Sequence, residues 1–251
     1  LLVVEDNPDL LAYLDKQLSP HWSVIQAQDG LEAIDKLKDH DVDLILSDIM
    51  MPNLDGLSLL KRVRDNLSTS HIPFLFLTAR GDNETELQSL MLAADDFLRK
   101  PFDARILGLK LKNILDNRRR LQAHLGHTPH TEATHSDDAS SLSPRDHRFV
   151  ERLTAYLDAH FEDETLTVAG LSDALAVDER TLQRKTNALF GQPPARFINA
   201  FRINKACEML ADPGATIQEV AYACGYANPR YFSRVFTTHR GQSPSQWRKN
   251  R

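Results

Sequence analysis

The sequence predicts two domains of different class, an α/β domain with a parallel sheet followed by an all-α domain. Three observations lead to this prediction. Over residues 1–121, short apolar runs alternate with amphipathic stretches, a rhythm typical of a parallel sheet with helices on both faces. Residues 122–147 are almost entirely polar. Residues 148–251 are helical by pattern and contain one signal twice, which a chain of 251 residues has room for as a second domain.

Five apolar runs predict the strands of the first domain. In chain order they are LLVV, SVIQA, DLILSD, IPFLFLT and DDFLRK. Amphipathic stretches such as LLAYLDKQL and GLEAIDKLKD lie between them, with apolar residues three and four apart. The last helix should run from about Ala104 to Arg120, because the basic run NRRR favours a helix C-terminus. The chain begins almost inside its first strand, so we expect it to be part of a longer protein.

Residues 122–147 predict a flexible linker between the domains. The stretch HTPHTEATHSDDASSLSP is rich in Ser, Thr, Asp and Pro and has almost no apolar residue with which to form a core. Four histidines are also present, at His124, His127, His130 and His135. Such a tract could bind a metal, but a flexible polar segment offers no preorganised ligand geometry. We therefore interpret the segment as a linker.

Residues 148–251 predict two helix-turn-helix units. The stretches LSDALAVDERTLQRKTNALFG and VAYACGYANPRYFSRVFTTHRG each have a short helix, a tight turn, an amphipathic helix and a final glycine. In the second unit, Thr216 and Glu219 predict a capping box, while Asn228 before Pro229 predicts an N-cap. A long helix from about Pro194 to Ala211 should join the units.

Composition limits where the protein works and what it binds. No segment approaches the roughly 18 consecutive apolar residues of a membrane span, and no leader pattern is present, so we expect a cytoplasmic protein without membrane contact in this segment. Cys207 and Cys224 have no metal-ligand or paired spacing and are expected to be small core residues. From Arg180 onward, 12 basic side chains face three acidic ones, which favours a polyanionic partner.

Five reactive residues follow predicted strands in the first domain. They are Glu5 and Asp6 after LLVV, Asp48 after LILS, Thr78 after IPFLFL and Lys100 after DFLR. In an open parallel sheet, ligands bind beyond the carboxyl ends of the strands. Grouped carboxylates repel one another unless a lysine or a divalent cation neutralises them, and Mg²⁺ prefers such hard oxygen ligands. The set fits phosphoryl transfer, with Asp48 as nucleophile, Glu5 and Asp6 as Mg²⁺ ligands, and Thr78 and Lys100 holding phosphoryl oxygens.

The motifs VVEDN, SDIMMPNLDG, LTAR and DDFLRKPF resemble the receiver domain of bacterial two-component response regulators, a flavodoxin-like fold. The resemblance covers residues 1–121. It implies that Asp48 accepts a phosphoryl group from a sensor histidine kinase, that Met50 offers a backbone carbonyl to Mg²⁺, and that Lys100–Pro101 is a cis bond. Thr78 and Phe97 occupy the switch positions of that family. Phe97 lacks the hydroxyl of the commoner tyrosine, which leaves switching by rotation of its ring.

The second helix of each helix-turn-helix unit carries side chains suited to reading bases. Arg, Gln and Asn donate hydrogen bonds to base edges in the major groove. In the first unit, the positions expected to be exposed are Arg180, Gln183, Arg184 and Lys185. In the second, they are Arg230, Tyr231 and Arg234. The bland alternative is that surface arginines only keep the helices soluble.

Residues 149–250 are similar to the AraC/XylS family of transcription regulators. The stretch IQEVAYACGYANPRYFSRVFTTHRGQSPSQWR carries the stronger signature. The similarity implies that both recognition helices read one face of double-stranded DNA, with a base-facing set that comprises Arg180, Gln183, Arg184, Arg230, Tyr231 and Arg234.

Together the two halves predict a phosphorylation-regulated, sequence-specific DNA-binding transcription regulator that forms a homodimer when phosphorylated. It would not be an enzyme, apart from taking up and slowly losing its own phosphoryl group. An alternative is the cytoplasmic C-terminal portion of a hybrid histidine kinase with the same output. A phosphatase of the haloacid-dehalogenase type would need a second aspartate two residues after Asp48, where Met50 stands. A receiver used only as an unphosphorylated dimerisation platform would not need the complete acidic set.

Overall fold

The computed structural model describes residues 1–79, 94–127, 142–212 and 214–250. The chain divides into two compact units. The first comprises Leu1–Arg120 with Leu142–Asp146, and the second comprises Leu121–Ser141 with His147–Arg251. The predicted succession of an α/β part and an all-α part is confirmed.

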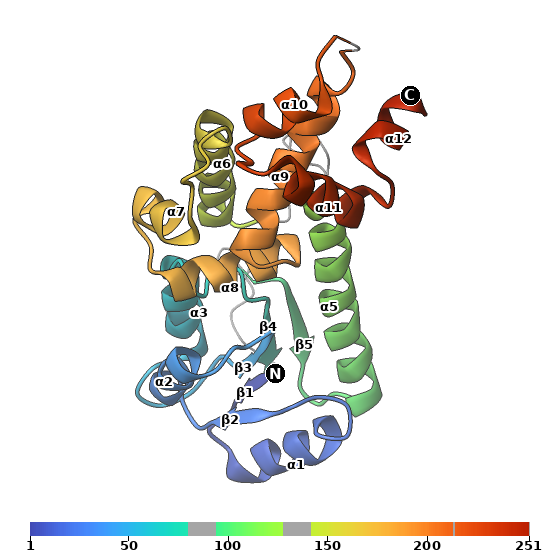
Figure 1. The fold of residues 1–251 in the computed structure, drawn as a ribbon. Helices are drawn as coiled ribbons and strands as arrows, with labels where there is room; N and C mark the ends of the chain where they lie inside the picture. Colours follow the sequence, from blue (N-terminus) through green and yellow to red (C-terminus); the bar gives the residue numbers. More distant parts are fainter. Residues whose placement is uncertain (80–93, 128–141, 213, 251) are drawn as a thin grey trace. The chain divides into compact units, whose positions relative to one another are not determined.

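The first unit is built on a five-stranded parallel sheet (Figure 1). The strands are β1 (Leu2–Val4), β2 (Ile25–Ala27), β3 (Ile45–Asp48), β4 (Phe74–Thr78) and β5 (Asp96–Arg99). Their order across the sheet is β2-β1-β3-β4-β5, and every neighbouring pair is parallel. The order reverses beside β1 and β3, so the crevice in which such sheets bind ligands lies at the carboxyl ends of these two strands.

Both faces of the sheet are covered by helices. These are α1 (Pro8–Leu18), α2 (Gly30–Asp39), α3 (Gly56–Asp65) and α5 (Ala104–His127). Successive side chains of a strand point to opposite faces, so β1 sends Leu2 and Val4 into one core cluster and Val3 into the other. The first cluster includes side chains of α2 and α3, and the second includes side chains of α1 and α5. Strands buried on both faces explain the near-continuous apolar runs in the sequence.

Helix α5 is longer than the sequence predicted. It runs to His127 instead of ending near Arg120. The physical reason is that Arg, Leu, Gln and Ala are good helix formers, and no proline interrupts the chain before Pro129. The expected linker is therefore helical at its start.

The far end of the expected linker is also helical, because α6 begins at Pro144. There Ser143 Oγ accepts a hydrogen bond from the backbone N–H of Asp146 at 3.1 Å. The proposed metal-binding tract of histidines cannot be placed. Residues 128–141, which include His130 and His135, lie outside the described residues, as do the side chains of His124 and His127.

The second unit is helical throughout its described part. Its helices are α6 (Pro144–His160), α7 (Val168–Leu175), α8 (Glu179–Phe190), α9 (Pro194–Met209), α10 (Ile217–Ala223), α11 (Pro229–Arg240) and α12 (Pro244–Lys249). The pairs α7/α8 and α10/α11 are the two predicted helix-turn-helix units, and α9 joins them (Figure 1). Helix α9 has 16 residues, two fewer than expected, and spans about 24 Å at 1.5 Å per residue.

Two expectations drawn from composition can be compared with the structure. Cys207 and Cys224 are both buried, as expected for small core residues, and burial raises the pKa of the Cys224 thiol to about 12. Among the helices that the structure describes, none combines the length and the apolar character that a membrane span requires.

Candidate functional site

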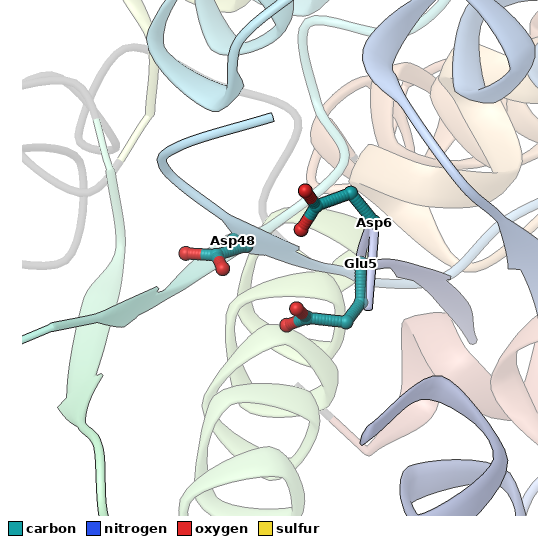
Figure 2. Close-up of side chains that lie close together, drawn as sticks. All are labelled: Glu5, Asp6 and Asp48. Atoms are coloured by element: carbon teal, nitrogen blue, oxygen red, sulfur yellow. The ribbon is translucent and has the colours of Figure 1, made fainter. Parts of the chain in front are cut away.

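The residues predicted from strand ends meet at one edge of the sheet. Glu5 and Asp6 directly follow β1, and Asp48 is the last residue of β3, which pairs with β1. Each of the three side chains offers a carboxylate oxygen, and these oxygens lie within 4.8 Å of one another. Figure 2 shows the three carboxylates side by side. Grouped carboxylates of this kind are the hard oxygen ligands that Mg²⁺ prefers.

Lys100 is the cation of this site. Its Nζ donates a hydrogen bond to Asp48 Oδ2 at 2.6 Å and another to Glu5 Oε2 at 2.8 Å. The backbone places it there, because the Lys100 N–H donates to the carbonyl oxygen of Thr78 at 2.7 Å. The peptide bond between Lys100 and Pro101 is cis, as the family resemblance implied. One ammonium therefore joins two of the three carboxylates.

Burial and neighbouring charges shift two of these groups. Glu5 is only 1% exposed, and burial, followed by the nearby Asp48 carboxylate, raises its pKa above the ordinary value, although Lys100 opposes this shift. Burial alone would lower the pKa of Lys100, but its hydrogen bonds to Asp48 and Glu5 outweigh burial, and the pKa is raised. The ammonium thus stays protonated at neutral pH.

The loop that follows β3 is tightly constrained around Asp48. The N–H of Ile49 donates to Asp48 Oδ1 at 2.7 Å, and the N–H of Gly56 donates to the Ile49 carbonyl at 2.8 Å. A Cβ at position 56 would lie 2.2 Å from the carbonyl oxygen of Asp48, so only glycine fits. The glycine in the SDIMMPNLDG motif thereby allows α3 to begin directly against β3, the strand that ends in Asp48.

A second contact fixes the tip of the same loop. Asn53 has a positive φ of 61°, and its Nδ2 donates a 2.6 Å hydrogen bond to Asp29 Oδ2 at the N-cap of α2. This pairing spans 24 positions in the sequence and was not predicted. The side chain of Met50 is 69% exposed in this loop, and the role of its carbonyl as a metal ligand stays a prediction.

The two expected switch residues lie in different surroundings. Thr78 ends β4 and is 3% exposed, next in sequence to Leu77, which pairs with Asp48 across the sheet. Phe97 lies in β5 opposite Phe76 and is 41% exposed. Thr78 is therefore adjacent to the acidic site, whereas the ring of Phe97 is on the surface.

The helix-turn-helix units of the second unit have the predicted caps. Thr216 and Glu219 form the capping box of α10, and Asn228 accepts hydrogen bonds at the start of α11. The turns require left-handed backbone in both units, at Ala176 with φ 54° and at Gly225 with φ 73°. The duplicated pattern in the sequence therefore corresponds to a duplicated structure.

Most of the expected base-facing residues are exposed. Arg180, Gln183, Arg230, Tyr231 and Arg234 are exposed, and Arg184 is half-buried. The guanidinium of Arg234 lies 5.4 Å from the centre of the Tyr231 ring, a cation–π contact that restricts both side chains.

The prediction that Lys185 is exposed was wrong, because this side chain is 0% exposed. The buried positions of α8 are Thr181, Leu182, Lys185, Thr186, Leu189 and Phe190. This stripe follows the helical period, and Lys185 falls on it. Charge alone suggested exposure, whereas the period of the apolar residues decides which face of the helix is buried.

Two further exposed polar residues lie beside the predicted base-facing residues, one on each helix. Asn187 follows Gln183 by one turn of α8, and Thr237 follows Arg234 by nearly one turn of α11. The i, i+3, i+4, i+7 spacing of one helix face could have found them. They would lengthen the polar stripe that each helix presents.

The first unit is a parallel α/β sheet with an acidic site at the carboxyl ends of its strands, and the second unit contains two helix-turn-helix motifs. In agreement, the response regulator receiver domain family matches residues 1–112, and a helix-turn-helix domain family of the AraC type matches residues 171–250. The chain therefore combines a response regulator receiver domain with an AraC-type helix-turn-helix domain.

Similar proteins include full-length signalling proteins and isolated domains. Histidine kinase P4 of Formosa agariphila is 28% identical over 247 residues, which is 98% of this chain but only 18% of that protein. Response regulator ArlR of Staphylococcus aureus (strain Mu50) is 34% identical over 116 residues, or 46% of this chain and 52% of ArlR. The signal receiver domain of a histidine kinase from Syntrophus aciditrophicus is 32% identical, with a TM-score of 0.44, over 47% of this chain and 91% of that one. The chain thus spans at most about half the length of these curated relatives.

Proposed function

We propose that this protein is a phosphorylation-regulated, sequence-specific DNA-binding transcription regulator of a bacterial two-component system. The observation that carries the proposal is the arrangement around Asp48, with Lys100 bonded to one carboxylate oxygen and Glu5 and Asp6 beside it. A helix-turn-helix domain in the same chain supplies the output. A sensor histidine kinase is the expected phosphodonor, and the cytoplasm is the expected location.

Phosphoryl transfer would proceed at the Asp48 carboxylate. A carboxylate oxygen attacks phosphorus, the oxygen–phosphorus bond forms, and the bond from phosphorus to the imidazole nitrogen of the donor histidine breaks. The N–H of Ile49 holds Oδ1 and so orients the carboxylate. Lys100 and Thr78, both at this edge of the sheet, would bind phosphoryl oxygens.

Glu5, Asp6, Asp48 and the carbonyl of Met50 would hold Mg²⁺. The carboxylates are hard oxygen ligands grouped at one strand edge, so the chemistry of the residues present fits the ion. When bound, the ion supplies positive charge next to the phosphoryl oxygens. We propose no enzymatic turnover of other substrates, only uptake and slow loss of the protein's own phosphoryl group.

DNA would be read by α8 and α11. The proposed base-facing residues are Arg180, Gln183 and Arg184 on α8, and Arg230, Tyr231 and Arg234 on α11. Five of these side chains are exposed, and their donors match base edges in the major groove. The 16-residue helix α9 joins the two units, and its length of about 24 Å is compatible with contacts in successive major grooves of double-stranded DNA, which recur about every 34 Å. Phosphorylation would act by favouring a homodimer on paired sites.

A second candidate is the cytoplasmic C-terminal portion of a hybrid histidine kinase with the same DNA-binding output. The observation that favours it is the match to histidine kinase P4, which spans 98% of this chain within a much longer protein. The gene sequence upstream of Leu1 distinguishes the candidates. A kinase ATP-binding module there would establish the hybrid, and a start codon just upstream would establish the separate regulator.

The phosphoacceptor is tested by labelling with a small phosphodonor such as acetyl phosphate in the presence of Mg²⁺. Wild-type protein should be labelled and Asp48→Ala should not. Asp35→Asn is the matched control, because Asp35 is an exposed carboxylate that pairs with Lys38 on α2, outside the site. Equal labelling of Asp48→Ala and wild type would overturn the assignment.

The output is tested by selecting bound sequences from a random pool of double-stranded DNA, with and without the phosphodonor. A shared sequence motif should emerge, and the phosphodonor should enrich paired copies of it. Recovery of DNA without any common motif would contradict sequence-specific binding. Recovery of the same single motif under both conditions would contradict control by phosphorylation.

A further inference from the structure

Arg202 of α9 is a buried cation that the proposed DNA contacts do not include. Its side chain is 7% exposed. Its Nε donates to the carbonyl oxygen of Phe161 at 3.0 Å, and its Nη2 donates to the carbonyl oxygen of Asp163 at 2.6 Å. Phe161 directly follows the end of α6 and Asp163 lies two residues further on, so the guanidinium lies near a helix C-terminus, where a positive charge is favourable. Burial of a guanidinium is unfavourable, so these contacts must offset its cost.

The turn of the second helix-turn-helix unit rests on the same arginine. Gly225 has φ 73°, and a Cβ there would lie 2.5 Å from the Phe161 carbonyl oxygen and 2.9 Å from Arg202 Nη2. The absence of a side chain at Gly225 is therefore what allows the turn to approach Arg202 and the end of α6. Three segments distant in sequence meet at this point.

Tyr226 continues the contact from Arg202 toward α11. The Arg202 guanidinium carbon lies 5.5 Å from the centre of the Tyr226 ring, and the Tyr226 hydroxyl donates to Asn199 Oδ1 at 3.1 Å. The Tyr226 ring centre lies 5.3 Å from that of Phe232, which is 0% exposed and belongs to the first turn of α11. A continuous series of contacts thus leads from Arg202 through Tyr226 to the start of α11.

The first helix-turn-helix unit is held in a different way. Its turn residue Ala176 has φ 54°, and the carbonyl oxygen of Leu175 accepts a 2.9 Å hydrogen bond from Nη2 of Arg152. Arg152 lies on α6 and its side chain is exposed. Removing Arg202 should therefore affect the second turn and leave the first in place.

We propose that Arg202 is a positioning residue that sets the orientation of α11, and with it the second DNA contact, through the Gly225–Tyr226 turn. This role of Arg202 can be measured in the free protein, whereas its effect on DNA binding rests on the proposed function. One experiment without DNA and one with DNA therefore test the two effects separately.

The first readout is hydrogen exchange of backbone amides in the full chain. Arg202→Met should speed exchange at Gly225–Phe232 by about tenfold or more, because local opening of this turn becomes easier, while exchange at Leu175–Leu182 stays unchanged. Arg202→Lys keeps the positive charge but lacks the planar guanidinium that bonds to both carbonyl oxygens, so exchange should be accelerated to an intermediate extent. If Arg202→Met does not fold, Arg202→Lys alone decides the outcome. Equal acceleration at both turns, or at neither, would overturn the proposal.

The control variant is Lys205→Met. Lys205 lies one turn further along α9 and pairs with Asp158 of α6 at 2.6 Å. The variant removes an ion pair between α9 and α6 and a cation–π contact to the Phe161 ring, and it keeps both hydrogen bonds of Arg202. It should leave exchange at Gly225–Phe232 at the wild-type rate. Acceleration as large as in Arg202→Met would mean that any loosening between α6 and α9 has this effect, and would overturn a specific role for Arg202.

The second readout is a footprint on the DNA selected above. Wild-type protein should protect two successive major grooves. Arg202→Met should keep protection of the groove bound by α8, lose protection of the groove bound by α11, and weaken binding by about tenfold or more, the scale of one good base contact. A general loss of stability would weaken both footprints together, and that result would overturn the proposal. If wild type protects no DNA, the proposed function fails, and the exchange measurement still decides the role of Arg202.

Discussion

Replacing Gly225 with alanine should destabilise the second unit more than the same change at Gly241. The two glycines have nearly equal backbone conformations, with φ 73° and 71°. They differ in surroundings. A Cβ at Gly225 would lie 2.5 Å from the Phe161 carbonyl oxygen, whereas a Cβ at Gly241 would meet nothing within 4 Å. Gly241→Ala is therefore a matched control for the conformational part of the effect.

The magnitudes follow from these distances. A left-handed conformation costs an L-residue about 1–2 kcal/mol, and alanine regains about 0.4–1 kcal/mol by restricting the unfolded chain, so Gly241→Ala should cost about 1 kcal/mol. At Gly225 the new methyl group must also displace a backbone carbonyl or the Arg202 side chain, and overpacking of this kind costs about 1–3 kcal/mol. The total expected for Gly225→Ala is about 2–4 kcal/mol.

Urea unfolding measures both values when a probe reports on the second unit alone. Trp247 is such a probe, because its ring centre lies 6.1 Å from that of Phe236 in α11, and Trp22→Phe removes the only other tryptophan. Midpoints are compared at equal slope, so that the differences report stability. If Gly225→Ala costs no more than Gly241→Ala, the reasoning from close approach is refuted.

Four further outcomes are expected. Ala176→Gly should raise the free energy of unfolding by up to about 1 kcal/mol in urea titrations, because glycine adopts φ 54° without strain; a loss would show that alanine is not strained there. Asn53→Ala should lower the free energy of unfolding of the first unit by about 1–2 kcal/mol in thermal melts, because alanine is strained at a backbone φ of 61° and the hydrogen bond to Asp29 is lost. Asn53→Gly loses only the hydrogen bond and should cost less. Equal losses for the two variants would contradict the backbone strain. Burial raises the pKa of Cys224 from 9.0 to about 12, so the unfolded chain loses this proton at lower pH than the folded protein, and the free energy of unfolding falls as pH rises from about 9 to 12. Cys224→Ala should remove up to about 1.4 kcal/mol per pH unit of that dependence. An unchanged dependence of stability on pH would count against the shift. Arg230→Ala should cost about 1–3 kcal/mol of discrimination at particular base pairs in competition assays, whereas uniform weakening on all DNA would make Arg230 a phosphate contact.

The sequence predicted the first unit well because its signals are local. Each strand is an apolar run, and the parallel arrangement brings every strand end to one edge, so Glu5, Asp48 and Lys100 could be grouped before any coordinates were known. Caps such as Thr216 with Glu219 were predicted for the same reason, since two residues three positions apart determine them.

Features that depend on tertiary contacts were not predicted. The buried residues of α9 do not form one narrow stripe, so the helical period of apolar residues gives no sign that Arg202 is buried or that it joins three segments. The pairing of Asn53 with Asp29 depends on the register of two loops 24 residues apart. Lys185 carries a charge that suggests exposure, and only the packing of α8 shows that it is buried.

The hydrogen bonds of Lys100 have a consequence for how the receiver domain depends on its ion. In many domains with a structural zinc site, metal binding supplies the free energy of folding, so removal of the metal denatures the domain. Here an ammonium of the chain itself bonds to Glu5 and Asp48, and the cluster is partly neutralised without any ion. Folding should therefore not depend on a bound metal. A chelator should slow the proposed phosphorylation and leave the melting temperature nearly unchanged, so Mg²⁺ would set the rate of phosphorylation in a domain that is already folded.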